Sequence, residues 1–90
     1  MRTLDMQVFA DRLCTARHHK QLSKVALAKA AQLKSPHLLT YLEKAQQPGV
    51  HAATLMRLAQ ALDVSIDYLV GLTDDPTPAR QRQERTDPIG

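Results

Sequence analysis

The 90-residue chain contains few of the residues that crosslink a fold, build an aromatic core or cradle phosphate. It has one cysteine, three glycines, two tyrosines, one phenylalanine and no tryptophan. A single cysteine cannot form an intramolecular disulfide, so the chain fits a reduced, cytosolic setting. We interpret Cys14 as an inert thiol on a helix, with a redox sensor as the alternative. No apolar run approaches the ~20 residues of a membrane span, and the N-terminus lacks the apolar segment of a signal peptide.

The sequence also lacks the patterns that mark an enzyme. It has no glycine-rich phosphate loop, and no Ser/His/Asp set with a plausible pocket in so small a chain. The histidines His18, His19, His37 and His51 show no metal-ligand spacing with cysteine or glutamate. We therefore expect no catalytic residue, no metal, no cofactor and no small-molecule ligand.

The remaining composition fits one small domain, expected over residues 1–72, and a flexible polar C-terminal tail over 73–90. A hydrophobic content of 43% can fill one core. Residues 1–72 carry nine Lys/Arg against five Asp/Glu, a net +4, whereas 73–90 carry three against four, a net −1. The tail has too few apolar residues to offset its ordering entropy. The basic balance of the domain mildly favours anionic partners.

Capping residues, apolar spacing and turn residues predict five short helices. The caps are Asp5, Ser23, Ser35 and Ser65, whose side chains can accept hydrogen bonds from the free amides of a first turn. Proline after the third cap costs no hydrogen bond at the first helical position. The expected spans are 6–20, 24 to 31–33, 36–44, 51–62 and 66–70.

The apolar spacing also predicts which residues face the core. The first helix offers Met6, Phe9, Ala10, Leu13 and the stem of Arg17; the second, Val25 or Ala26, with Leu27 and Ala30; the third, Leu38 or Leu39, with Leu42; the fourth, Leu55, Leu58, Ala59 and Leu62.

These positions resemble the Cro/repressor-like (xenobiotic-response-element type) helix-turn-helix family over residues 6–72. The resemblance rests on Phe9, Leu13, Arg17, Leu22-Ser23, Leu27-Ala28, Ser35, Leu39, Leu42-Glu43, Leu55, Leu58-Ala59 and the run from Ala61 to Gly71. It implies an all-α fold, a compact five-helix lambda-repressor-like domain with the helix-turn-helix at the second and third helices. The third helix, which is the second of this motif, normally enters the DNA major groove.

The resemblance also implies roles for named residues. Arg17 and Glu43 would form an ion pair between the first and third helices, with two solvated side chains as the alternative. The DNA phosphate contacts would be Lys24, Lys34, Ser35, Lys44 and Gln46, and the base-reading residues Pro36, His37, Thr40 and Tyr41. The dimer interface is expected at Ile66, Tyr68, Leu69, Val70 and Leu72, although Ile66 and Leu69 could instead close the core.

Two turns depart from the family pattern. One residue more than usual separates Ser23 from Ser35, and the usual glycines are missing from this turn and from position 21, which is Gln21. A non-glycine residue in left-handed geometry costs roughly 1 kcal/mol. The sequence therefore predicts that either turn is built differently.

Together these features predict a sequence-specific DNA-binding transcriptional regulator, a repressor that binds a palindromic operator as a homodimer through residues 35–44. The expected partners are double-stranded DNA and a second copy of the chain, with a regulatory protein as a further candidate. The expected location is cytoplasmic, on a bacterial or phage nucleoid. The alternative is an antitoxin, anti-activator or adaptor that uses the same fold for protein–protein interaction.

Overall fold

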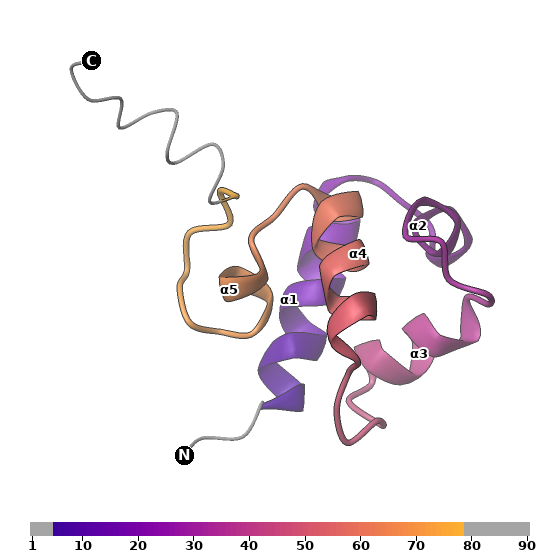
Figure 1. The fold of residues 1–90 in the computed structure, drawn as a ribbon, viewed down its shortest axis with the longest axis horizontal. Coiled ribbons are helices and arrows are strands. Elements are labelled where there is room, and N and C mark those ends of the chain that lie inside the picture. Colours follow the sequence, from indigo (N-terminus) through magenta and orange to yellow (C-terminus); the bar gives the residue numbers. More distant parts are fainter. Residues whose placement is uncertain (1–4, 79–90) are drawn as a thin grey trace.

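The computed structural model describes residues 5–78, which form five helices and no strand, so the predicted all-α class is confirmed. The helices are α1 (Met6–His19), α2 (Lys24–Ala30), α3 (His37–Glu43), α4 (Ala52–Leu62) and α5 (Ile66–Leu69). Helix α1 packs against α3 and α5, while α4 packs against α2 and α5 (Figure 1). None of the described helices is long and apolar enough to cross a membrane.

Three helices begin at the predicted side-chain caps. Asp5 accepts hydrogen bonds from the amides of residues 7 and 8, Ser23 from Ala26 and Ser65 from Tyr68. Helix α3 begins one residue later than predicted, at His37, and Pro36 precedes it as the capping residue without a side-chain cap. The hydroxyl of Ser35 still accepts from the amide of His37 at 3.1 Å. The serine therefore steadies the turn that leads into α3.

All five helices end with a residue in left-handed geometry. These residues are Gln21, Gln32, Ala45 and Asp63, with φ between 55° and 60°, and Gly71, with φ 86°. In each case the next amide donates back five residues, as Leu33 does to the carbonyl of Ala28 at 2.8 Å. This Schellman pairing satisfies carbonyls at the helix end. The prediction that the two turns without glycine are built differently is wrong, because the glutamines adopt the left-handed geometry themselves.

Ala45 gives a direct measure of this backbone strain. We expect Ala45→Gly to stabilise the protein by about 1 kcal/mol, because glycine loses no energy at positive φ. The control Gln60→Gly, in the exposed interior of α4, is expected to destabilise it by about 1 kcal/mol. Urea denaturation of both variants measures the two changes. Destabilisation by both would show that the left-handed geometry at residue 45 costs little.

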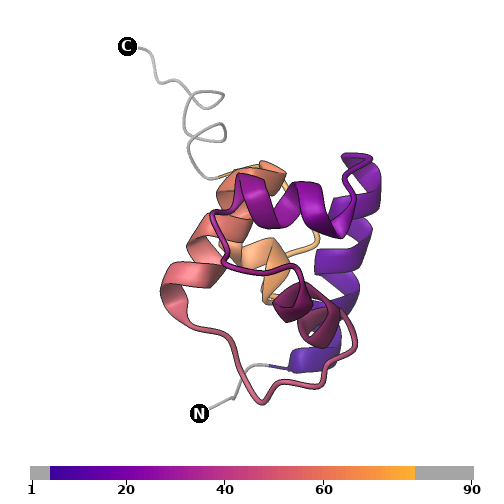
Figure 2. The same ribbon diagram turned by 90° about the vertical axis from the view of Figure 1, so that its right-hand side faces the viewer.

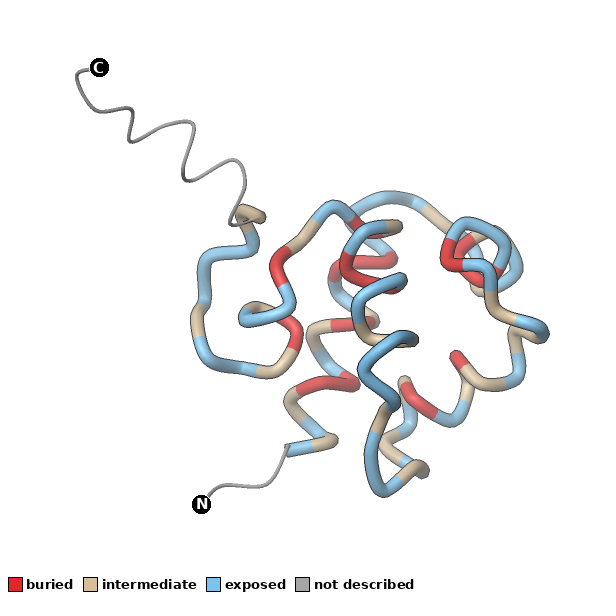
Figure 3. Tube along the Cα trace, in the orientation of Figure 1, coloured by how far each residue is buried: buried red, intermediate tan, exposed pale blue. Residues whose placement is uncertain are grey.

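Leucine and alanine make most of the core, and Figure 3 marks the buried positions along the helices in red. The fully buried large side chains are Phe9, Leu13, Leu27, Leu39, Leu42, Leu58, Leu62 and Leu69. The predicted inner face of α2 was partly wrong. Its buried side is Leu27, Ala28 and the following Ala31, whereas the predicted Ala30 is exposed and Val25 is 53% exposed. The two small alanines fit an inward position where helices pack closely.

Residues 73–78 lie against the domain. The Arg12 guanidinium lies over the Tyr68 ring, 4.4 Å from its centroid, and donates to the Thr73 carbonyl at 3.0 Å and to Asp74 at 2.6 Å. The amide of Ser65 donates to the carbonyl of Pro76 at 2.9 Å. The division of the chain at residue 72 stays a prediction, but Thr73, Asp74 and Pro76, beyond that point, form hydrogen bonds with the helical domain. Residues 79–90 of the expected tail lie outside the described part.

Candidate nucleic-acid interface

Helices α2 and α3 and the turn between them form one side of the molecule, seen at the front in Figure 2. Leu39 and Leu42 of α3 are buried, while His37, Tyr41 and Lys44 are exposed. A spacing of four and then three residues puts these three side chains along one face of a helix. Helix α3 therefore has an anchored inner face and a polar outer face.

A buried ion pair joins α3 to α1. Arg17 Nε donates to Glu43 Oε2 at 2.7 Å, and its Nη2 donates to Oε1 at 3.0 Å. The side chains are only 11% and 7% exposed. Arg17 Nη1 also donates to the carbonyl of Leu22 at 2.9 Å. The hydrogen bonds to Glu43 raise the pKa of Arg17 above its ordinary value, against the opposing effect of burial. The structure thus brings together the two residues expected to pair, and ties them to the turn after α1.

The four candidate base-reading residues occupy different environments. His37 and Tyr41 are exposed, Tyr41 at 47%. Pro36 is half-buried in the turn before α3. Thr40 is half-buried, and its hydroxyl accepts from Lys24 Nζ at 3.4 Å. His37 and Tyr41 are therefore the freest of the four to reach a base edge.

The candidate phosphate contacts surround α3. Lys34, Lys44 and Gln46 are exposed, and Ser35 is half-buried with its hydroxyl bound to an amide. Lys24 leans across from α2 to Thr40. Between residues 23 and 44 the chain has four lysines and a single acidic residue, Glu43, which Arg17 already neutralises. The surface around α3 is thus basic with no free carboxylate from this segment.

The residues expected at a dimer interface divide between core and surface. Leu69 is fully buried and closes the core. Tyr68 is half-buried and carries Arg12 on its ring. Ile66 and Leu72 are 37% and 70% exposed, and Val70 is half-buried. Ile66 and Leu72 are therefore the most accessible of the five to a second molecule, whereas Leu69 is not accessible.

Val25 was missed as a surface residue. Apolar spacing offered Val25 or Ala26 to the core; Ala26 is half-buried, whereas Val25 lies exposed in the first turn of α2, next to Lys24. The pattern of Leu27, Ala28 and Ala31 at positions i, i+1 and i+4 was the signal for the alternative buried face. Within residues 5–78, no group of three or more His, Cys, Asp or Glu could hold a metal ion.

Comparison with known proteins gives one relative to report. The chain is 34% identical over 67 residues to YobD, an uncharacterized HTH-type transcriptional regulator of Bacillus subtilis (strain 168). The match covers 58% of this chain and 60% of the relative's length. No protein-family model matches the chain, and no solved structure matches it. The chain is thus similar to an HTH-type regulator over part of that protein's length.

Proposed function

We propose that the chain is a sequence-specific DNA-binding transcriptional regulator, a repressor that binds a palindromic operator as a homodimer. The observation that carries this proposal is the exposed polar outer face of α3, which has lysines around it and is held in place by the buried Arg17–Glu43 pair. The name of the relative, an HTH-type transcriptional regulator, also supports it. A helix anchored on its inner face and exposed on its outer face suits insertion into a major groove.

In this proposal the lysines bind the DNA backbone and the exposed face of α3 reads bases. Lys24, Lys34 and Lys44 would neutralise phosphates, with Ser35 and Gln46 contributing hydrogen bonds. The imidazole of His37 can donate to or accept from a base edge, and the Tyr41 hydroxyl can donate. Pro36 offers apolar contact to a thymine methyl group, and Thr40 keeps its hydroxyl within reach of Lys24.

A homodimer would supply the contacts that one small domain lacks. The exposed side chains of Ile66 and Leu72, extended by Val70 and the edge of Tyr68, provide an apolar surface at and just after α5. Two-fold symmetry of the protein would require half-sites about one helical turn apart, roughly 34 Å. Occupying such a site suits repression by blocking access to DNA.

A selection of bound sites from random double-stranded DNA tests this function. With the full chain, we expect enrichment of a two-fold symmetric motif whose half-sites lie about 10 base pairs apart. The control His37→Ala/Tyr41→Ala changes only exposed side chains, and we expect it to stay folded and to enrich no such motif. An asymmetric motif would contradict the homodimer, and no enrichment by the parent chain would contradict sequence-specific DNA binding.

One observation favours the alternative of a protein-interaction module. A hollow of about 460 Å³ lies between α3 and the start of α4, with Leu38, Leu42, Pro48 and Val50 among its walls. A partner that docked there would bind with little dependence on salt. DNA binding through several lysines weakens steeply with salt, so a salt titration of the bound complex separates the two functions.

A further inference from the structure

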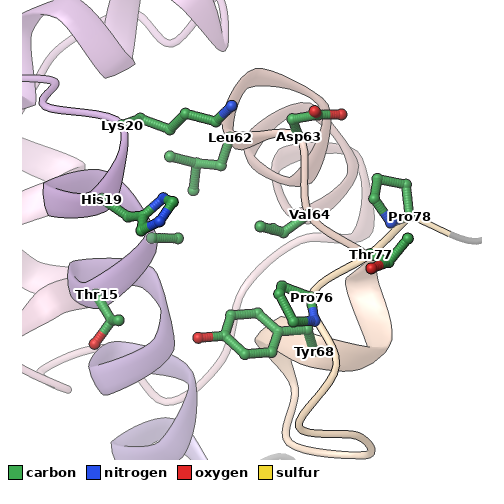
Figure 4. Close-up of a pocket in the computed structure, with 11 residues that line it drawn as sticks. Thr15, His19, Lys20, Leu62, Asp63, Val64, Tyr68, Pro76, Thr77 and Pro78 are labelled. Atoms are coloured by element: carbon green, nitrogen blue, oxygen red, sulfur yellow. The ribbon is translucent and has the colours of Figure 1, made fainter. Parts of the chain in front are cut away.

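Residues 71–76, here termed the strap, follow α5 and cross the domain on a fixed course. Gly71 begins the strap in left-handed geometry, and a Cβ added there would lie 2.8 Å from Cγ1 of Val8 on α1. At the other end, the carbonyl of Pro76 accepts from the amide of Ser65 at 2.9 Å. There the chain closes one side of a hollow of about 280 Å³ between the end of α1 and the link from α4 to α5 (Figure 4). The strap is therefore held against the domain at both ends.

Arg12 of α1 holds the middle of the strap. Its guanidinium donates to the carbonyl of Thr73 at 3.0 Å and to Asp74 at 2.6 Å. The same group lies over the ring of Tyr68, 4.4 Å from its centroid, and the Arg12 side chain is only 23% exposed. A planar guanidinium can stack on a ring and donate in two directions at once, which a lysine cannot do. One side chain of α1 thus fixes α5 and the strap relative to each other.

Leu72 lies between these fixed points, with its side chain in solvent. Its amide donates to the carbonyl of Asp67 at 2.8 Å, and Arg12 holds the residue that follows it. The side chain is nevertheless 70% exposed, more than any other large hydrophobic side chain within residues 5–78. Burying a side chain whose backbone is already ordered costs less entropy than ordering it on binding. Leu72 is therefore placed to act as an anchor for a partner molecule.

The surroundings of Leu72 suit an apolar contact with a second copy of the chain. The amide of Val70 donates to the carbonyl of Ile66 at 3.0 Å, so these two residues lie one helical turn apart. Ile66 is 37% exposed and Val70 is half-buried. In a two-fold contact, each Leu72 would pack on this same patch of the other copy.

The charges around the strap give Arg12 a second effect on such a contact. Residues 63–75 carry four aspartates and no lysine or arginine, so two copies that meet here repel each other through these charges. Arg12 lowers the repulsion because it pairs with Asp74, whose side chain is 97% exposed. The same aspartates make this side of the molecule unsuited to DNA.

From these contacts we propose that Arg12 is a positioning residue for self-association. By holding the strap against α1 and Tyr68, it keeps Leu72 where that side chain anchors a second copy of the chain. The inference rests on the homodimer of the proposed function, and it names the anchor of that dimer and the group that orders it. Without the guanidinium, Leu72 would have to be ordered each time two copies associate, and the dimer would be weaker.

Sedimentation equilibrium of the full chain, without DNA, tests this role. We expect the parent to dimerise reversibly, and Arg12→Gln to raise the dissociation constant of the dimer about 10-fold. Leu72→Ala should raise it at least as much, as expected for an anchor residue. The double variant Arg12→Gln/Leu72→Ala should be no weaker than Leu72→Ala alone, because Arg12 acts through Leu72. Additive effects of the two changes would overturn the positioning role.

Two further variants separate position from charge. Asp74→Asn keeps Arg12 stacked on Tyr68 and bound to Thr73, so the dimer should be at least as tight as that of the parent. Arg12→Gln/Asp74→Asn removes the unpaired charge but leaves the strap free, and it should stay about 10-fold weaker than the parent. Recovery of the parent's affinity by this variant would show that Arg12 acts through charge alone.

Hydrogen exchange at the amide of Ser65 shows whether the strap is closed, since that amide donates to Pro76. Exchange should be faster in Arg12→Gln than in the parent and unchanged in Leu72→Ala. A parent that stays monomeric at all concentrations would overturn the homodimer of the proposed function together with this role of Arg12. A dimer that Arg12→Gln leaves unchanged would overturn the role of Arg12 alone.

Discussion

Replacing Arg17 with alanine is expected to lower the free energy of unfolding by about 3–5 kcal/mol, the cost of leaving a buried charge without its partner. Glu43 is only 7% exposed at its side chain and receives two hydrogen bonds from Arg17. The carbonyl of Leu22 would lose its guanidinium donor as well. Small domains have total stabilities of about 5–15 kcal/mol, so a loss of this size should be evident in a urea or thermal unfolding curve.

The chain contains its own matched control for this prediction. Arg12 and Asp74 form an equally short ion pair, at 2.6 Å, but the Asp74 side chain is 97% exposed. Glu43→Gln is expected to destabilise the protein by several kcal/mol, because it leaves the Arg17 charge buried. Asp74→Asn should stay within about 0.5 kcal/mol of the parent, as exposed pairs contribute little. Similar effects of the two changes would mean that burial does not govern the Arg17–Glu43 pair.

The double change Arg17→Met/Glu43→Leu distinguishes the cost of breaking the pair from its net contribution. Hydrophobic replacements of buried ion pairs are often neutral or stabilising, by about 1–4 kcal/mol. We therefore expect the double variant to recover most of the stability that Arg17→Ala loses. If it recovers stability but binds DNA more weakly, the pair serves to orient α3 on α1. If it remains as unstable as Arg17→Ala, the side-chain geometry around Leu22 is the larger contribution.

Local signals explain why the fold could be predicted from the sequence. Asp5, Ser23 and Ser65 each cap a helix through hydrogen bonds to residues two or three positions away. Such short-range pairs leave a recognisable order of residue types along the chain. In contrast, the seven-residue α2 is too short for periodicity to choose between two apolar faces. Packing decided the choice, and placed Ala28 inside and Val25 outside.

Contacts between distant residues account for what sequence reasoning missed. Arg12 binds Thr73 and Asp74 across 61 and 62 positions of the chain, and no local pattern connects them. The hollow lined by Ala16, Val64, Tyr68 and Pro76 likewise depends on α1, the α4–α5 link and residue 76 meeting in space. Within the candidate interface, the ion pair between Arg17 and Glu43 could be predicted only through the family resemblance. The freer exposure of His37 and Tyr41 relative to Thr40 required the structure.

The second large expected effect is the loss of DNA affinity when Lys24, Lys34 and Lys44 are all replaced by glutamine. Each lysine that contacts a phosphate contributes about 0.9 to the slope of log affinity against log salt concentration. Removing three per protomer should make that slope shallower by roughly 3 per protomer. At 0.15 M salt the same relation predicts an affinity about 100-fold weaker per protomer. Fluorescence anisotropy with labelled duplex DNA over a range of salt concentrations measures both quantities.

A control that removes the same charge shows whether position matters. Lys20, Lys29 and Arg57 are exposed and carry the same three positive charges. Lys29 is five residues after Lys24 on α2, which places it about 140° around the helix from Lys24. Replacing these three by glutamine should change the salt slope far less, since net charge alone acts only through weak long-range attraction. Equal salt slopes for the two triple variants would show that DNA affinity depends on overall charge, and that the lysines around α3 do not bind the DNA phosphates.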